Sequence, residues 1–151
     1  MHRFLRHVRS PEFKLSQQDR NELMGIAKKS VEAAVRERKL YQCSTGSEAL
    51  MQDRRAFVTL RKTGELRGCI GYIAPLKPLC MTVRDVAASA AVQEPRFPPV
   101  CVAELGELEF EISVLSPLRR VTDIKQIKVG QHGLVMKRGR THRRKQSGTG
   151  L

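Results

Sequence analysis

The hexapeptide Leu66-Arg67-Gly68-Cys69-Ile70-Gly71 decides how this chain is interpreted. It follows an apolar run, residues 56–60, across five polar residues that include a glycine, and this pattern predicts a β-hairpin. In the second strand, Gly68 directly precedes Cys69 and Gly71 follows it two residues later. Because glycine inside a strand marks a bulge, a bend or a close approach of another group, Cys69 is the leading candidate for a functional side chain.

Two amphipathic helices are predicted, one on each side of the hairpin. The first begins at the capping-box pattern Ser16-Gln17-Gln18-Asp19 and runs for about twenty residues. The second begins after Pro78 and ends before Pro95, since the residue preceding a proline is pushed out of the helical region. Their apolar stripes, at helical spacing, are Leu23, Ala27, Val31, Ala34 and Val35 in the first helix and Leu79, Val83, Val86, Ala87 and Ala90 in the second.

The segment 107–116 alternates between apolar and polar residues, which predicts a half-buried strand. Three glutamates share its polar face, but no histidine alternates with them, so a solvated face is favoured over a metal site. Residues 40–53 are predicted to be a loop, residues 121–127 a helical turn, and residues 134–136 a short strand. Strands and helices without regular β-α-β alternation predict the α+β class.

Length and charge limit the classes of function. The chain of 151 residues is long enough for one domain with its own core. Its formal charge of +13 is concentrated in the acid-free ends, residues 1–9 and 137–151, so the body between them is only mildly basic. Nucleic-acid binding therefore rests on the ends alone. We see no signal peptide, no apolar run long enough to cross a membrane and no CxxC pair, so we expect a cytoplasmic protein with four reduced thiols, no membrane partner and no metal.

Two further segments carry candidate site residues. The loop 94–99 holds an acid, Glu94, and a guanidinium, Arg96, between prolines that fix the backbone. The alternative to a functional loop is a stiff connection whose Phe97 packs into the core. His132 lies beside a glycine at a predicted junction between turn and strand, and it is either a catalytic base or a structural hydrogen-bonding residue.

Five blocks in a fixed order carry a resemblance to a known family. They are AFVTL (56–60), LRGCIG (66–71), PRFPP (95–99), EISVLS (111–116) and VGQHGL (129–134). Together they resemble the AMMECR1 domain family, whose bacterial and archaeal members are also called AmmeMemoRadiSam system protein A. The hexapeptide is the signature of that family, and the resemblance covers roughly residues 16–139.

The resemblance implies an α+β fold with a mostly antiparallel or mixed sheet, packed helices and a smaller subdomain. It implies an association, at least genomic, with Memo-like proteins and radical SAM enzymes. It implies no settled activity, no cofactor and no oligomeric state. In the family, the signature cysteine has been suggested as part of an active site, and that suggestion carries over to Cys69, with Arg67, Gly68 and Gly71 as its framework.

The chain departs from the family pattern in two places. Family members often have aspartate where this chain has Glu94, which is longer by one methylene. Residues 140–151 are basic and lack apolar periodicity, where family members continue with a strand and a helix. We therefore expect a loose lead-in over residues 1–15, a domain over residues 16–139 that is incomplete at its C-terminus, and a tail from a truncated or frame-shifted reading frame.

Two hypotheses of different classes follow. In the first, the protein is an enzyme or enzyme subunit with Cys69 as nucleophile and His132 as base, and Glu94 and Arg96 contact the substrate. Arg67 shares a strand face with the thiol and is also expected to bind substrate, together with the backbone N–H groups around Gly68 and Gly71, which form an oxyanion site. In the second, the protein is a non-catalytic binding or scaffold module, in which the glycines allow close packing and the cysteine is a small buried hydrophobe.

Overall fold

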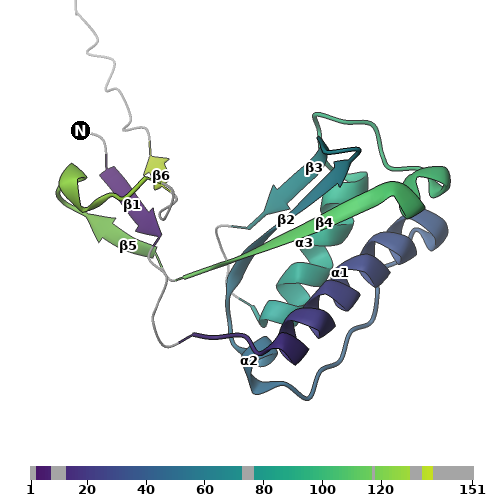
Figure 1. The fold of residues 1–151 in the computed structure, drawn as a ribbon, viewed down its shortest axis with the longest axis horizontal. Helices are drawn as coiled ribbons and strands as arrows, with labels where there is room; N and C mark the ends of the chain where they lie inside the picture. The colour runs from purple at the N-terminus through teal and green to yellow at the C-terminus, as the bar shows by residue number, and fades with distance from the viewer. Residues whose placement is uncertain (1–2, 8–12, 73–76, 117, 130–133, 138–151) are drawn as a thin grey trace, which may run out of the picture. The chain divides into compact units, whose positions relative to one another are not determined.

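The computed structural model describes residues 3–7, 13–72, 77–116, 118–129 and 134–137. The chain divides into two compact units (Figure 1). The larger comprises residues 9–117, and the smaller combines residues 1–8 with residues 118–151. Helices and antiparallel strands in separate stretches of chain make the fold α+β, as the sequence predicts.

The larger unit contains a three-stranded antiparallel sheet in the order β3-β2-β4. Its strands are β2 (Arg55–Lys62), β3 (Glu65–Gly71) and β4 (Leu108–Leu115). The predicted hairpin is confirmed, but its connection is shorter than the five polar residues indicate. Lys62 pairs with Glu65, so only Thr63 and Gly64 turn the chain, with φ of 50° and 78°. Positive φ at both positions is the geometry of a type I′ turn, whose twist matches that of the two strands.

Both predicted helices form, and the structure gives the capping box at the start of the first. Helix α1 spans Gln17–Glu37 and α3 spans Leu79–Val92. The Ser16 hydroxyl accepts from the Asp19 amide at 3.0 Å, and the Asp19 carboxylate accepts from the Ser16 amide at 2.9 Å. Helix α3 ends ahead of Pro95, as expected. One short helix, α2 (Glu48–Met51), lies in the segment predicted to be a loop.

The core lies between one face of the sheet and the helices α1 and α3, which pack against each other (Figure 1). Alternate residues of β2, namely Ala56, Val58 and Leu60, are fully buried against α3. Leu108, Phe110, Ile112 and Val114 of β4 pack against the same core, whereas the glutamates of β4 are exposed, which confirms the predicted alternation. The opposite face of the sheet carries Thr59 and Glu111 and is the face on which the candidate thiol lies.

The smaller unit is a second antiparallel sheet in the order β5-β1-β6. Its strands are β1 (Arg3–His7), β5 (Leu118–Val121) and β6 (Leu134–Lys137), and a 3₁₀ turn, η2 (Ile124–Gln126), follows β5. The predicted short strand at 134–136 and the predicted turn are both present. No pattern in the sequence predicts β1, because a five-residue strand with three charged or titratable side chains has little apolar alternation.

Candidate functional site

The signature hexapeptide forms strand β3, and its glycines are explained by packing. Gly68 is buried against helix α3, and a Cβ atom there would overlap the carbonyl oxygen of Ala90. A Cβ atom at Gly71 would overlap the ring of Phe57 on β2. Gly68 therefore lets a helix backbone approach the strand directly, as the scaffold hypothesis expects for this residue.

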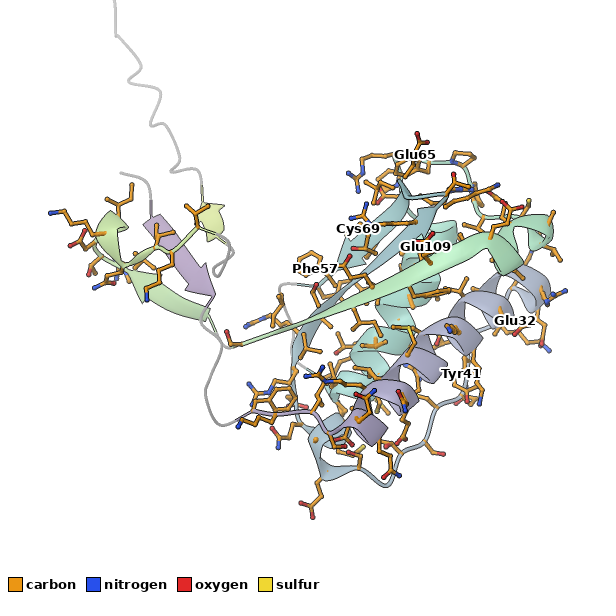
Figure 2. The ribbon with its side chains drawn as sticks, in the orientation of Figure 1. Glu32, Tyr41, Phe57, Glu65, Cys69 and Glu109 are labelled. Carbon is orange, nitrogen blue, oxygen red and sulfur yellow. The ribbon has the colours of Figure 1, made fainter. Side chains whose placement is uncertain are left out.

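Cys69 lies on the sheet face opposite the helices and is half-buried (Figure 2). It pairs with Thr59 on β2, and the Thr59 Oγ1 atom lies 3.2 Å from the Cys69 sulfur. Either atom can donate in this contact. The sulfur is thus neither sealed among aliphatic side chains nor without a polar neighbour, which is the condition that a thiol-dependent reaction requires.

Glu94 connects the proline-rich loop to the backbone of Cys69. The Cys69 amide donates to Glu94 Oε2 at 3.1 Å. Arg96 donates to the same carboxylate through two nitrogens, Nε at 3.0 Å and Nη2 at 2.8 Å. Only 6% of the Glu94 surface is exposed, whereas 57% of the Arg96 side chain is exposed. The predicted loop therefore brings its acid and its guanidinium to the signature cysteine.

These contacts favour the ionised forms of Glu94 and Arg96. The Arg96 guanidinium and the Cys69 amide lower the pKa of Glu94 to about 2, because both stabilise its ionised form. The Glu94 carboxylate in turn raises the pKa of Arg96, with a smaller contribution from Cys69. Since the Cys69 amide already binds Glu94, that amide is not free to form the oxyanion site that the sequence suggested.

Arg67 is held by a residue that the sequence analysis did not identify. A register shift in the hairpin pairs Leu60 with Gly68 and Arg61 with Leu66, so Arg67 is the extra residue of a β-bulge. Its Nε and Nη2 atoms donate to Glu104 at 3.0 and 3.1 Å. The interaction with Arg67 holds the pKa of Glu104 far below its ordinary value. Nothing in the spacing of two residues 37 positions apart could have predicted this pair.

A third donor of Arg67, Nη1, reaches the carbonyl oxygen of Pro98 at 2.9 Å. Lys62 also contacts the Glu104 carboxylate, at 3.3 Å. The guanidinium of Arg67 therefore binds Glu104 and the Pro98 carbonyl, and none of its hydrogen bonds reaches the thiol. A role for Arg67 in binding substrate stays a prediction.

The other cysteines and the predicted base lie elsewhere. Cys80 is buried within the hydrophobic core, and Cys43 is partly buried against the same core. Cys101 is exposed. Burial raises the pKa of the Cys80 thiol, and the neighbouring Cys43 raises it further. His132 lies outside the described residues. Within the described ranges, no cluster of three histidine, cysteine, aspartate or glutamate side chains is arranged to hold a metal ion.

The AMMECR1 family model matches residues 24–149. The chain belongs to the AMMECR1 family. The match reaches beyond the blocks that carry the resemblance and includes most of the basic C-terminal segment.

Proteins from several organisms are similar to this chain. A protein of Methanothermobacter thermautotrophicus is 39% identical over 132 residues, covering 83% of this chain and 69% of its own. A Methanopyrus kandleri protein is 34% identical over 135 residues, covering 83% and 65%. The crystal structure of an uncharacterized protein from Pyrococcus horikoshii superposes with a TM-score of 0.58 at 34% identity, covering 63% of this chain and 50% of that one. The chain thus spans about two thirds of the curated relatives and half of the solved structure.

No helix of the described residues is both long and apolar enough to cross a membrane.

Proposed function

We propose that this AMMECR1 protein acts through the thiol of Cys69, as a cysteine-dependent enzyme or enzyme subunit in the cytoplasm. The observation that carries the proposal is the half-buried sulfur on the helix-free face of the sheet, 3.2 Å from the Thr59 hydroxyl. The backbone of the same residue is anchored by Glu94, so the sulfur is held on a rigid strand. A nucleophile held in a fixed position lowers the entropic cost of reaching a reactive geometry.

The chemistry available to this thiol is nucleophilic attack on an electrophilic substrate atom. The thiolate is the reactive form, and a hydrogen bond from Thr59 together with the positive charge of Arg96 would stabilise it. Glu94 offsets part of that charge, so a separate base is needed to remove the proton. His132 is our candidate for that base, on the sequence argument alone.

The exposed guanidinium of Arg96 is the group best placed to contact a substrate. Its two inner donors bind Glu94, but more than half of the side chain faces solvent. Glu94 itself is buried and acts by positioning Arg96 and the Cys69 backbone. We further propose that Memo-like and radical SAM proteins are the partners of this site, which rests on the family resemblance.

Alkylation of the four cysteines tests the proposal. The intact protein is treated with iodoacetamide at pH 7, and the rate at each cysteine is followed by peptide mass spectrometry. We expect Cys69 to react before Cys101, although Cys101 is the more exposed thiol. The variant Thr59→Val should slow the reaction at Cys69 and leave Cys101 unchanged. Rates that simply follow exposure, with Cys101 first, would remove the basis for a nucleophilic role.

A non-catalytic binding or scaffold module is the second candidate, and one observation favours it. Gly68 allows the close contact with α3, so packing explains this residue of the signature without any catalytic role. In that case Cys69→Ser should leave partner binding unchanged in a pull-down with a Memo-like protein. It should also leave unchanged any cellular phenotype that wild-type protein rescues, whereas a thiol-dependent enzyme would lose that rescue.

A further inference from the structure

A cavity of about 750 Å³ opens in the larger unit between the start of α1 and the end of β4. No residue of the signature hexapeptide and neither Glu94 nor Arg96 lines it. The volume lies in the range of about 300–1,000 Å³ that small-molecule sites occupy. The cavity is therefore separate from the thiol site and large enough for an organic ligand.

Among the described residues, three cations and no acid line this cavity. Lys14 and Arg20 are exposed, and the half-buried guanidinium of Arg54 lies 4.1 Å from the centre of the Phe13 ring. None of the three forms an ion pair with a carboxylate of the described residues. Asp19, the acid next to Arg20, does not line the cavity. A concave surface with one sign of charge attracts ligands of the opposite sign.

The carboxylate of Asp19 is already satisfied. It accepts from the Ser16 amide at 2.9 Å and from the Ser47 hydroxyl at 2.6 Å, and the Ser47 contact is the largest cause of its lowered pKa. The carboxylate thus serves the cap of α1 and the loop before α2. Because Asp19 does not line the cavity, the charged side chains of the described lining are all positive.

Two buried polar atoms without partners lie at the same end of β4. The Ser116 hydroxyl, in a residue that is 7% exposed and lines the cavity, has no hydrogen-bond partner among the described residues, and neither does Arg55 Nε. Arg55 pairs with Leu115, the residue next to Ser116. Because an unpaired buried polar group is costly, the Ser116 hydroxyl, which lines the cavity, points to a group that the protein binds here.

Apolar side chains form the remaining wall of the cavity. They are Leu15, Leu23, Met24, Ile112, Val114 and Leu115. In the described sheet β4 pairs only with β2, so the outer edge of β4 along the cavity keeps backbone N–H groups available. The cavity thus combines an apolar wall, hydrogen-bond donors and positive charge.

We infer that this cavity binds a small organic anion, with its phosphate or carboxylate group at Lys14, Arg20 and Arg54 and its apolar body against the residues of α1 and β4. The cations supply charge-assisted hydrogen bonds to the anionic group. The apolar wall excludes ligands that are polar throughout. Since the inference does not involve Cys69, it stands independently of the proposed thiol chemistry.

A pair of fluorescent probes tests the charge requirement. The intact protein is titrated with the anion 8-anilinonaphthalene-1-sulfonate and, separately, with the neutral N-phenyl-1-naphthylamine. We expect saturable binding of the anionic probe at one site, weakened by added salt, and weaker binding of the neutral probe that is insensitive to salt. Equal affinity for the two probes, or no saturable binding, would overturn the inference.

Matched variants locate the site. Lys14→Gln and Arg20→Gln should each weaken binding of the anionic probe by about two- to fivefold, because each removes one surface charge from the rim. Lys28→Gln removes an exposed charge from α1 outside the cavity and should change the affinity by less than the precision of the titration. If Lys28→Gln weakens binding as much as the rim variants, the effect is general charge and the cavity is not the site.

Competition distinguishes the two kinds of anion. Phenyl phosphate and octanoate are each added to the complex of the protein with the anionic probe, and inorganic phosphate serves as the control without an apolar body. Displacement by one of the two organic anions identifies its group as the preferred one. If inorganic phosphate displaces the probe as well as both of them do, the apolar wall contributes nothing and the inference fails.

Discussion

Two arginine–carboxylate pairs lie beside strand β3, and they differ in how far water reaches the arginine. The side chain of Arg67 is 13% exposed and binds Glu104, whereas that of Arg96 is 57% exposed and binds Glu94. In both pairs the carboxylate also accepts from the backbone N–H of a cysteine. The same arginine–carboxylate interaction thus occurs once with an enclosed arginine and once with an arginine at the surface.

The two pairs also differ in the segments that they connect. Arg67 and Glu104 are 37 positions apart, so their contact holds the bulged strand to the segment after the proline-rich loop. Arg96 and Glu94 are two positions apart, so their contact orders only the loop itself. The Arg96 side chain therefore remains accessible to solvent, whereas Nε, Nη1 and Nη2 of Arg67 all donate to groups of the protein.

Gly68→Ala should have the largest effect, because it disturbs both pairs at once. A Cβ atom at this position collides with the Ala90 carbonyl oxygen, a backbone atom that moves only if α3 moves. We expect a loss of about 3 kcal/mol in the free energy of unfolding, measured by urea denaturation. The control is Gly25→Ala in α1, where nothing lies within 4 Å and the change should stabilise by about 0.5–1 kcal/mol. A Gly68→Ala protein as stable as wild type would mean that close packing does not explain this glycine.

Arg67→Ala should have the second-largest effect on the free energy of unfolding, because it leaves the carboxylate of Glu104 with Lys62 as its nearest cation. We expect a loss of about 2 kcal/mol, since hydrogen bonds to charged groups contribute about 1.5–3 kcal/mol and this side chain is mostly enclosed. Arg67→Lys should recover only part of that loss, because an ammonium cannot form the two parallel bonds of the guanidinium. Urea denaturation of the three proteins at pH 7 measures both differences. Full recovery by lysine would show that charge alone matters here.

Arg96→Gln should destabilise less than Arg67→Gln, and its effect should depend on pH. The folded protein holds the pKa of Glu94 at about 2, below its ordinary value of 4.5, so this contribution to stability is complete above pH 4.5 and disappears as pH falls toward 2. The variant should therefore be less stable than wild type at pH 7, and the difference should shrink between pH 4.5 and 2. Denaturation curves across that range measure it, with Arg36→Gln on the exposed end of α1 as the control. A difference that does not change with pH would separate Arg96 from the ionisation of Glu94.

Thr63→Asn should have the smallest effect and leave both pairs intact. Thr63 has φ of 50° in the two-residue turn, a conformation that a β-branched residue adopts at a cost and that asparagine tolerates. We expect a gain of ~0.5 kcal/mol in stability, with no change in the alkylation rate of Cys69. Destabilisation by asparagine would indicate that the Thr63 side chain supports the hairpin in another way.

Much of the larger unit was predictable because its signals are local. The capping box at Ser16, the stripes of α1 and α3, and the alternation of β4 all reflect contacts between a regular element and one apolar face. The smaller unit was less predictable. Strand β1 is only five residues long, and its partners β5 and β6 come from more than a hundred positions later in the chain.

The residues of the candidate site were likewise predictable only in part. The sequence marked Cys69, Glu94 and Arg96, and the structure brings these three together. It did not mark Glu104, whose contact with Arg67 depends on a bulge that shifts the register of the hairpin. Arg54 was also missed as a cavity residue, because its stacking on Phe13 joins segments about forty positions apart.

The sequence by itself determined the family, the α+β class, the positions of the main helices and strands, and the identity of the candidate thiol. Each of these depends on residue order within a short window, where spacing alone sets which side chains share a face. Only the tertiary structure decided what the glycines pack against, which arginine is enclosed, and where cations gather around an apolar cavity. These depend on contacts between distant segments, which form when the sheet and helices pack and which no local pattern encodes.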